Sequence, residues 1–212
     1  VRRRRTSGDS EAMPLRPRTT HEVKSMATEE MSYDVIEQRG DAELRQYAPA
    51  IVAETKVNGP FEWVGNVAFG RLAGYIFGRS RGRKQMAMTA PVTQTAAPEK
   101  IAMTAPVLQE PKRGRSWVVS FVMPAEYSMD ALPEHGVPKV RLSERPGQLM
   151  MALRYAGGWR RSLFERNRNK LEETVAREGF VPTGPAVFAR YDPPMTPWFR
   201  RRNEVLIPVE AA

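Results

Sequence analysis

The chain has no cysteine among its 212 residues, which excludes disulfide bonds, thiolate metal ligands and a cysteine nucleophile. It has only two histidines, His21 and His135, and no pair at the spacing of a zinc or iron site, so a metal site built by the protein is not expected. No apolar run approaches the roughly 20 residues of a membrane-spanning helix, and no signal-peptide segment follows the N-terminal arginines. We therefore expect a cytoplasmic protein without a membrane span.

Motifs for catalysis are equally scarce. Residues 78–82 read G-R-S-R-G and match the G-x-S-x-G string of hydrolase nucleophile elbows, but that string functions on a turn from a strand to a helix. Here it follows a predicted helix, so a basic surface loop is the favoured interpretation. No glycine-rich phosphate loop precedes a predicted helix, and no pair of acids stands out as an acid–base couple. The sequence leaves enzymatic activity uncertain and favours a protein without it.

The net charge of +9 is unevenly distributed along the chain. Residues 1–25 carry seven basic and three acidic residues, a net +4, which leaves +5 for the remainder. Residues 1–31 are polar and lack hydrophobic periodicity, so we predict a disordered basic tail there and a folded domain over residues 32–210. A basic arm can contact nucleic acid or an anionic membrane. No aromatic residue interleaves with these arginines, so nucleic-acid binding is not favoured.

The most distinctive feature is a stretch that occurs twice. Met86–Val92 reads M-A-M-T-A-P-V, and Ile101–Val107 repeats it as I-A-M-T-A-P-V. Alternation places the larger apolar residues of each copy on one face of a strand, and the proline near each end suits an edge or a strand terminus. We predict two strands of one sheet, joined by a loop over residues 93–100. Their methionines line either the sheet core, which is favoured, or the wall of an apolar pocket.

The pattern before this stretch indicates strands followed by a helix. Period-two alternation predicts strands over residues 33–37, 43–47 and 51–57, the first two as a hairpin. Apolar residues then recur at three- and four-residue steps, which predicts an amphipathic helix of roughly 17 residues. Asn58 suits its N-cap, Pro60 its first turn and Gly78 its C-terminal end.

Further strands are predicted over residues 116–122 and, as an edge strand, 139–143. The second half then repeats the order of elements of the first. A strand over 148–155, a helix from Trp159 to Gly179, and strands over 186–191 and 203–209 follow. The strand–helix–strand–strand unit thus occurs twice. It predicts an α+β fold, in which a distorted antiparallel β-barrel of two pseudo-symmetric halves has two long helices packed outside.

Several motifs in this order resemble the SOUL/haem-binding protein family. They are the doubled A-M-T-A-P-V, the F-V-M-P of residues 121–124, the Y-D-P-P-M of 191–195 and the R-R-N-E-V of 201–205. The opening, Y-D-V-I-E at residue 33 and E-L-R-Q-Y at residue 43, is also similar. The similarity covers about residues 32–209, nearly the whole predicted domain. It implies a barrel with two helices, in agreement with the residue pattern.

The resemblance also implies a function. Members of the family bind haem and related tetrapyrroles in an apolar cleft beside the first helix and the proline-rich loop near the C-terminus, without catalysis. Matching positions here are Asn66, Phe69, Ala73 and Gly74 on the helix, and Met195, Thr196 and Trp198 in the loop. The apolar surplus near the loops, rimmed by cations, adds Phe77 and Arg201, and suits a flat hydrophobic molecule with carboxylates.

Haem or a related tetrapyrrole is therefore the expected ligand. Because no histidine lies in a predicted strand or helix, we expect haem to be weakly coordinated and held by packing and arginines, with Arg71, Arg200 or Arg201 as cations. The alternative is an enzyme or sensor module that acts on another small hydrophobic ligand in the same cleft, using a cleft acid such as Glu204. The sequence leaves the oligomeric state open.

Overall fold

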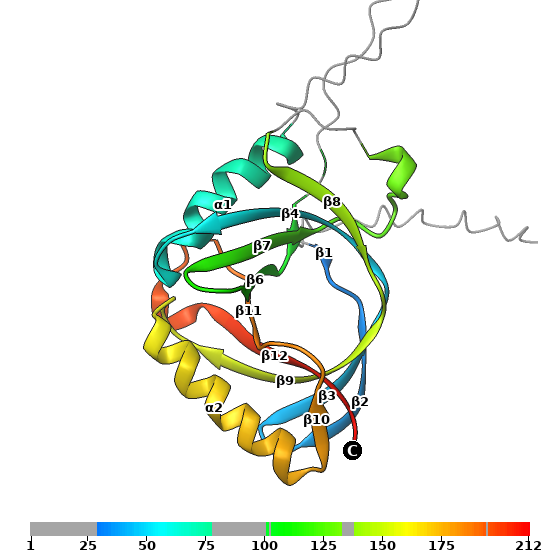
Figure 1. Cartoon of the computed structure of the whole chain (residues 1–212), viewed down its shortest axis with the longest axis vertical. Helices are drawn as coiled ribbons and strands as arrows, with labels where there is room; N and C mark the ends of the chain where they lie inside the picture. The colour runs from blue at the N-terminus through cyan, green and yellow to red at the C-terminus, as the bar shows by residue number, and fades with distance from the viewer. Residues whose placement is uncertain (1–28, 78–100, 102, 133–137, 194) are drawn as a thin grey trace, which may run out of the picture.

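The computed structural model describes residues 29–77, 101, 103–132, 138–193 and 195–212. Ten of the strands form one strongly curled antiparallel sheet, and the two helices pack on its outer face (Figure 1), while β1 (Glu29–Glu30) and β5 (Thr104–Ala105) form a separate two-stranded parallel pair. The predicted α+β architecture is therefore confirmed. Within the described residues, no helix is long and apolar enough to cross a membrane.

The first half contains a hairpin, a strand, the first helix and three further strands. Their bounds are β2 Tyr33–Arg39, β3 Ala42–Tyr47, β4 Ala50–Asn58, α1 Phe61–Ile76, β6 Val107–Pro111, β7 Ser116–Val122 and β8 Val140–Arg145. The second half contains β9 Gln148–Ala156, α2 Arg161–Arg177, β11 Val187–Arg190 and β12 Arg202–Ala211. Shorter elements are β1 Glu29–Glu30, β5 Thr104–Ala105, η1 Met129–Ala131, β10 Phe180–Pro182 and η2 Trp198–Arg200.

The strand order makes the internal symmetry visible. The sheet runs β2-β3-β9-β12-β11-β6-β7-β4-β8, with β10 paired to β12. Read outwards from the central β11–β6 pair, β11-β12-β9 corresponds to β6-β7-β4. The halves are joined by a crossed pairing, because β3 pairs with β9 of the second half, whereas β8, which leads directly into β9, pairs with β4. The prediction of two equivalent halves is confirmed, and β8 is an edge strand as expected.

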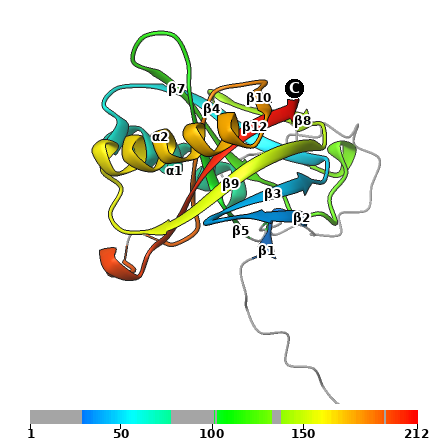
Figure 2. The same cartoon turned by 90° about the horizontal axis from the view of Figure 1, so that it is seen from below.

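Alternation along the strands separates two apolar faces. The outer face packs against the helices: α1 buries Val64, Ala68 and Leu72 against β4 and β7, and α2 buries Leu171 and Val175 against β9 and β12. The two helices overlap in the view of Figure 2, and their first turns meet through Phe61 and Phe164, whose ring centres lie 5.3 Å apart. The concave face holds a separate apolar cluster from β4, β6, β9, β11 and β12. The strands β4, β9, β11 and β12 thus contribute to apolar clusters on both faces, which fixes their register.

The predicted start of α1 is wrong by two residues. Asn58 is the last residue of β4 and pairs with Ser116 of β7, so it is held in extended conformation and does not cap the helix. Pro60 is the N-cap residue and makes no side-chain capping bond. Sheet pairing therefore overrides the local capping preference of asparagine. The predicted end at Gly78 lies outside the described residues.

The second copy of the doubled stretch is not one strand. Residues Thr104–Ala105 form β5, which pairs in parallel with β1, and β6 begins at Val107. Pro106 lacks an N–H group and separates the two strands. The first copy, the loop after it, residues 78–82 and both histidines lie outside the described residues. So do residues 1–28 of the predicted tail, whereas Glu29–Glu30 form β1.

Candidate functional site

An apolar cleft lies between α1 and the loop that follows β11. Its volume is about 380 Å³, near the lower end of the range for small-molecule sites, roughly 300–1,000 Å³. The helix α1 supplies one wall of the cleft, and the second copy of the doubled stretch supplies another. The remaining lining residues are Trp159, just before α2, and residues of β11 and the loop after it. The lining residues are Gly65, Asn66, Phe69, Met103, Thr104, Ala105, Val107, Trp159, Arg190, Tyr191, Asp192 and Pro193.

The second copy therefore contributes to a pocket wall, the less favoured of its two interpretations. Met103 is partly exposed beside the cleft, whereas Ile101 is buried in the core cluster beneath α1. Thr104 is buried and its hydroxyl donates to the carbonyl of Val122, which fixes this wall to β7. The copy thus serves both as core and as wall.

Arg190 forms part of the cleft floor although it is only 5% exposed. Its guanidinium lies 4.8 Å from the ring centre of Trp159 and 4.9 Å from that of Phe188. Its Nη2 donates to Oε1 of Gln109 over 2.7 Å. Burial lowers the pKa of Arg190 to about 10. The group therefore remains a cation at neutral pH in largely apolar surroundings.

Glycine at position 65 makes room for this cation. A Cβ atom at Gly65 would lie 2.3 Å from Nη1 of Arg190, closer than non-bonded atoms approach. A larger residue on this face of α1 would therefore displace the guanidinium. The absence of a side chain at Gly65 therefore allows Arg190 to pack directly against α1.

Trp159 is positioned by the turn between β9 and α2. Gly157 has a φ of 136°, and a Cβ there would lie 2.6 Å from the side chain of Leu163, so only glycine fits without strain. The Gly157 carbonyl accepts a hydrogen bond from Nδ2 of Asn203 over 2.9 Å. The guanidinium of Arg201 covers the indole of Trp159 at 4.3 Å, a favourable cation–π distance.

The loop after β11 is fixed by β12. Oδ2 of Asp192 accepts a hydrogen bond from the backbone N–H of Arg202 over 2.6 Å. The hydroxyl of Tyr191 donates to Oε2 of Glu204 over 2.8 Å, and the guanidinium of Arg202 lies 3.8 Å from the centre of the Tyr191 ring. This wall of the cleft is therefore largely preformed.

Glu204 itself faces away from the cleft. It is fully buried on the concave face and receives hydrogen bonds from Nη1 of Arg45 over 2.7 Å and Nη2 of Arg202 over 3.0 Å. Burial alone would raise the pKa of Glu204, but its bonds to Arg45, Tyr191 and Arg202 hold it below the ordinary value. The expectation that Glu204 is a cleft acid is wrong, because Glu204 does not line the cleft.

The structure brings some of the predicted site residues together. Asn66 and Phe69 line the cleft, and Phe69 is braced by an edge-on contact with Phe121 at 5.6 Å. Arg201 reaches the cleft through Trp159. Ala73 lies one turn further along α1 and does not line the cleft.

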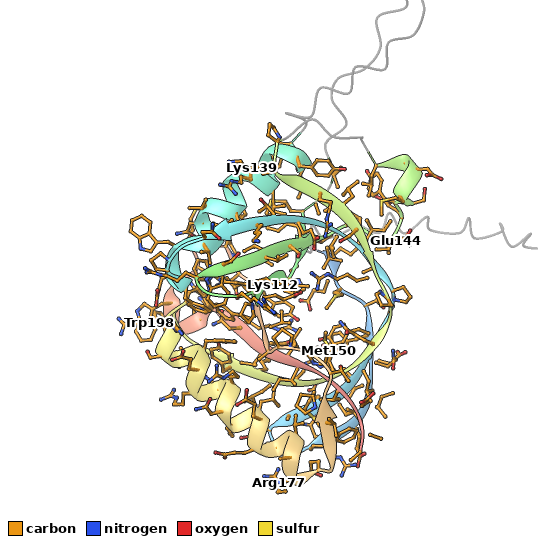
Figure 3. The ribbon with its side chains drawn as sticks, viewed as in Figure 1. Lys112, Lys139, Glu144, Met150, Arg177 and Trp198 are labelled. Atoms are coloured by element: carbon orange, nitrogen blue, oxygen red, sulfur yellow. The ribbon has the colours of Figure 1, made fainter. Side chains whose placement is uncertain are left out.

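The other predicted residues are more exposed. Phe77, at the end of α1, is half-exposed, and Met195 is 90% exposed. Trp198 is 65% exposed in η2, beside the turn at Gly157 and Gly158, and Figure 3 shows it at the edge of the molecule. None of the three lines the cleft, and Trp198 lines a separate pocket beside Gly157 and Gly158.

None of the three candidate cations lines the cleft, and Arg201 contacts it only through Trp159. Nη1 of Arg71 donates to the carbonyl of Lys56 over 3.0 Å, and Arg200 is exposed in η2. Sequence reasoning missed Trp159 and Arg190. An arginine inside an otherwise apolar strand, and a double glycine before a tryptophan, were the available signals.

Comparison with known proteins gives both a family and a fold. The sequence matches the family profile described as SOUL heme-binding protein over residues 28–208. The C-terminal domain of EcmrR superposes with a TM-score of 0.57 at 12% identity, covering 86% of this chain and 100% of that one. A hydrolase from Listeria innocua also gives 0.57 at 12% identity, covering 82% and 93%. At this identity the two structures show a shared fold alone. Among curated proteins there is no significant sequence match.

Proposed function

The chain belongs to the SOUL haem-binding protein family, and we propose that it binds a tetrapyrrole, haem or a related macrocycle, in the cleft beside α1. On this proposal the protein carries or buffers the ligand and does not chemically change it. The observation that carries the proposal is the apolar wall formed by Phe69, Val107 and Trp159 around a volume of about 380 Å³. Such a wall, with a few polar groups, is typical of small-molecule sites.

The rest of the site extends outwards from this cleft. Asn66 and Phe69 contact the ligand directly. A macrocycle with its substituents protrudes from the opening, so Met195 and Trp198 cover its exposed side, with Arg201 behind Trp159. Ala73 and Phe77 continue the apolar surface along the helix. These contacts would add to the apolar area removed from water on binding.

The residues of the cleft fit a macrocycle better than they fit its iron. Of the described lining residues, Met103 alone carries a thioether, a known haem ligand type, and none carries an imidazole. Haem would therefore be held mainly by packing, with Met103 as the candidate axial ligand. A metal-free porphyrin should bind with similar affinity.

A carrier role is also supported by how the other polar groups of the cleft are used. The Tyr191 hydroxyl is bound to Glu204 and the Asp192 carboxylate to the backbone of Arg202. Both groups therefore have structural partners. A general base must be within hydrogen-bond reach of the proton it removes, and these two groups are oriented towards the protein.

Titration of the purified protein with haemin, followed by the Soret band, tests the proposal. We expect saturable binding at micromolar protein. Phe69→Ala should weaken it by about tenfold or more, since a contacting phenyl ring contributes roughly 1.5–3 kcal/mol. Trp63→Ala is the matched control, because Trp63 is an aromatic residue of the same helix, 71% exposed and outside the cleft.

Two results would overturn the proposal. One is the absence of a saturable Soret shift in the wild type. The other is equal loss of affinity in Phe69→Ala and Trp63→Ala, which would indicate binding elsewhere. Thermal unfolding of each variant checks that α1 is intact. A saturable ligand other than a tetrapyrrole, bound with the same dependence on Phe69, would favour the sensor alternative.

A further inference from the structure

Arg190 is a buried cation without a carboxylate partner among the residues that the structure describes. Within the described part of the chain, its side chain donates one hydrogen bond, from Nη2 to the neutral amide of Gln109 over 2.7 Å. The remaining guanidinium nitrogens are unused by the described residues: Nε is fully buried without a partner, and Nη1 lies beneath Gly65 at the cleft. A buried charge without a counter-ion is costly, so this arrangement needs a reason.

A second unpaired donor lies beside it. The indole N–H of Trp159 is buried without a hydrogen-bond partner within the described part of the chain, and its ring stacks on the Arg190 guanidinium at 4.8 Å. Both residues line the cleft. An unpaired cation and an unpaired donor thus lie side by side at an apolar cleft, with hydrogen-bonding capacity that no described residue uses.

The sheet register places a third donor without a partner among the described residues, the Tyr155 hydroxyl, in the same part of the sheet. Arg190 of β11 pairs with Asn203 of β12, which pairs with Tyr155 of β9, so the three side chains lie in one row on the outer face. The Tyr155 hydroxyl is buried and unpaired, as is Oδ1 of Asn203. Burial raises the pKa of Tyr155, so this hydroxyl remains a donor at neutral pH. This row of three polar side chains therefore contains buried groups whose hydrogen-bonding capacity the described residues do not use.

Two acidic residues in the surroundings of Arg190, Asp192 and Glu62, each accept a hydrogen bond from a backbone N–H group and form no ion pair with it. Asp192 lines the cleft but its Oδ2 accepts the Arg202 N–H over 2.6 Å. Glu62 influences Arg190 only through space, and its Oε1 accepts the backbone N–H of Arg161 over 3.1 Å. The charge of Arg201 opposes that of Arg190. The cleft floor therefore retains cationic character that a ligand anion can neutralise.

We propose that Arg190 and Trp159 form an anion subsite in the cleft floor that binds a free carboxylate of the ligand, with Tyr155 supporting it from the sheet. That the ligand is a tetrapyrrole rests on the proposed function. The subsite further requires a macrocycle with at least one free acid side chain directed into the cleft. The carboxylate accepts hydrogen bonds from the guanidinium and the indole, which are stronger than neutral ones. An ester of the same side chain lacks the charge.

The experiment compares haemin with haemin dimethyl ester on the full-length protein, by Soret titration and tryptophan fluorescence quenching. Wild type should bind haemin about tenfold or more tightly than the ester, the scale of one charge-assisted bond. Arg190→Gln should remove this preference by weakening haemin binding and leaving ester binding within about twofold. Arg177→Gln, at the far end of α2 from Trp198 in Figure 3, is the surface control and should retain the preference.

A second variant leaves the arginine in place. Gly65→Ala introduces the Cβ that would lie 2.3 Å from Nη1, so it should displace the guanidinium and lower the preference for the acid. If wild type binds both ligands equally, or if Arg190→Gln weakens both equally, the subsite is overturned while the proposed function stands. If neither ligand binds the wild type, the proposed function fails as well.

Discussion

The carboxylate of Glu204 on β12 is joined to the guanidinium of Arg45 on β3 across the concave face of the sheet, at 2.7 Å. Both side chains are almost completely buried, with 0% and 3% exposed. The pair bridges β9, which lies between the two strands. Through the Tyr191 hydroxyl it also anchors the loop that forms one wall of the cleft. A structural network on the concave face of the sheet thus supports one wall of the proposed cleft.

Removing the charge of Glu204 should be costly. Glu204→Gln removes the buried carboxylate that Arg45 and Arg202 share. Among the described residues, Arg45 then keeps only the partly exposed Glu43, at 2.7 Å, as an ion-pair partner. Breaking a buried pair costs about 3–5 kcal/mol. We expect a loss of this size in the free energy of unfolding, measured by urea denaturation. The double replacement Arg45→Met with Glu204→Leu should recover most of it, because buried ion pairs are often replaceable by apolar residues. A double variant less stable than the single one would contradict this.

The same pair predicts how stability responds to acid. The pKa of Glu204 is lowered in the folded protein, so its contribution to stability is present above the unfolded-state pKa of about 4.3 and is lost as the pH falls through the lower, folded value. The difference in unfolding free energy between wild type and Glu204→Gln should therefore shrink as the pH falls from 5 through and below that range. A difference that stays constant with pH would show that the carboxylate charge is not the cause.

The turn before α2 offers a matched pair of glycine substitutions. Gly157→Ala places a Cβ at a φ of 136° and 2.6 Å from Leu163, which should destabilise the protein by about 1–3 kcal/mol. It should also weaken haemin binding, since Trp159 follows two residues later. Gly158→Ala is the control, because a Cβ there meets nothing within 4 Å. Equal effects of the two replacements on stability and binding would contradict the account of this turn.

The N-terminal boundary of the domain can be tested by truncation. Deleting residues 1–28 should leave unfolding and haemin binding unchanged, because the described contacts begin with β1. Deleting residues 1–31 removes the β1–β5 pairing, the bond from Met31 N–H to the Ala105 carbonyl and the ion pair of Glu30 with Arg202 at 2.8 Å. We expect a loss of about 1–3 kcal/mol. Equal stability of the two truncated proteins would place the boundary later in the chain.

The regular elements could be predicted because their patterns are local. The strongly apolar run over residues 116–122 coincides with β7, and the apolar steps of α1 coincide with its buried face. The two-residue strands β1 and β5 could not be predicted, since two residues carry no periodicity. The end of β4 was misjudged at Asn58, where cross-strand pairing with Ser116 prevailed over capping.

Only part of the candidate site could be predicted from the sequence. Asn66 and Phe69 were found because they lie on a predicted helix in positions that resemble a family motif. Arg190 and Trp159 were missed, because their meeting depends on the register of β11 and on the turn at Gly157. Glu204 was misassigned, since alternation tells which residues share a face but not which face borders the cleft.

The most direct test of the central claim is to locate the ligand by paramagnetic broadening of amide NMR signals on addition of ferric haemin. Binding in the proposed cleft should broaden the signals of Gly65, Phe69 and Trp159 first. The signal of Arg177, which lies at the far end of α2 from Trp198 in Figure 3, should persist. Broadening centred on Met150, in the cluster of the concave face, with sharp signals from Gly65 and Trp159, would show that the ligand binds inside the curl of the sheet and would contradict the account.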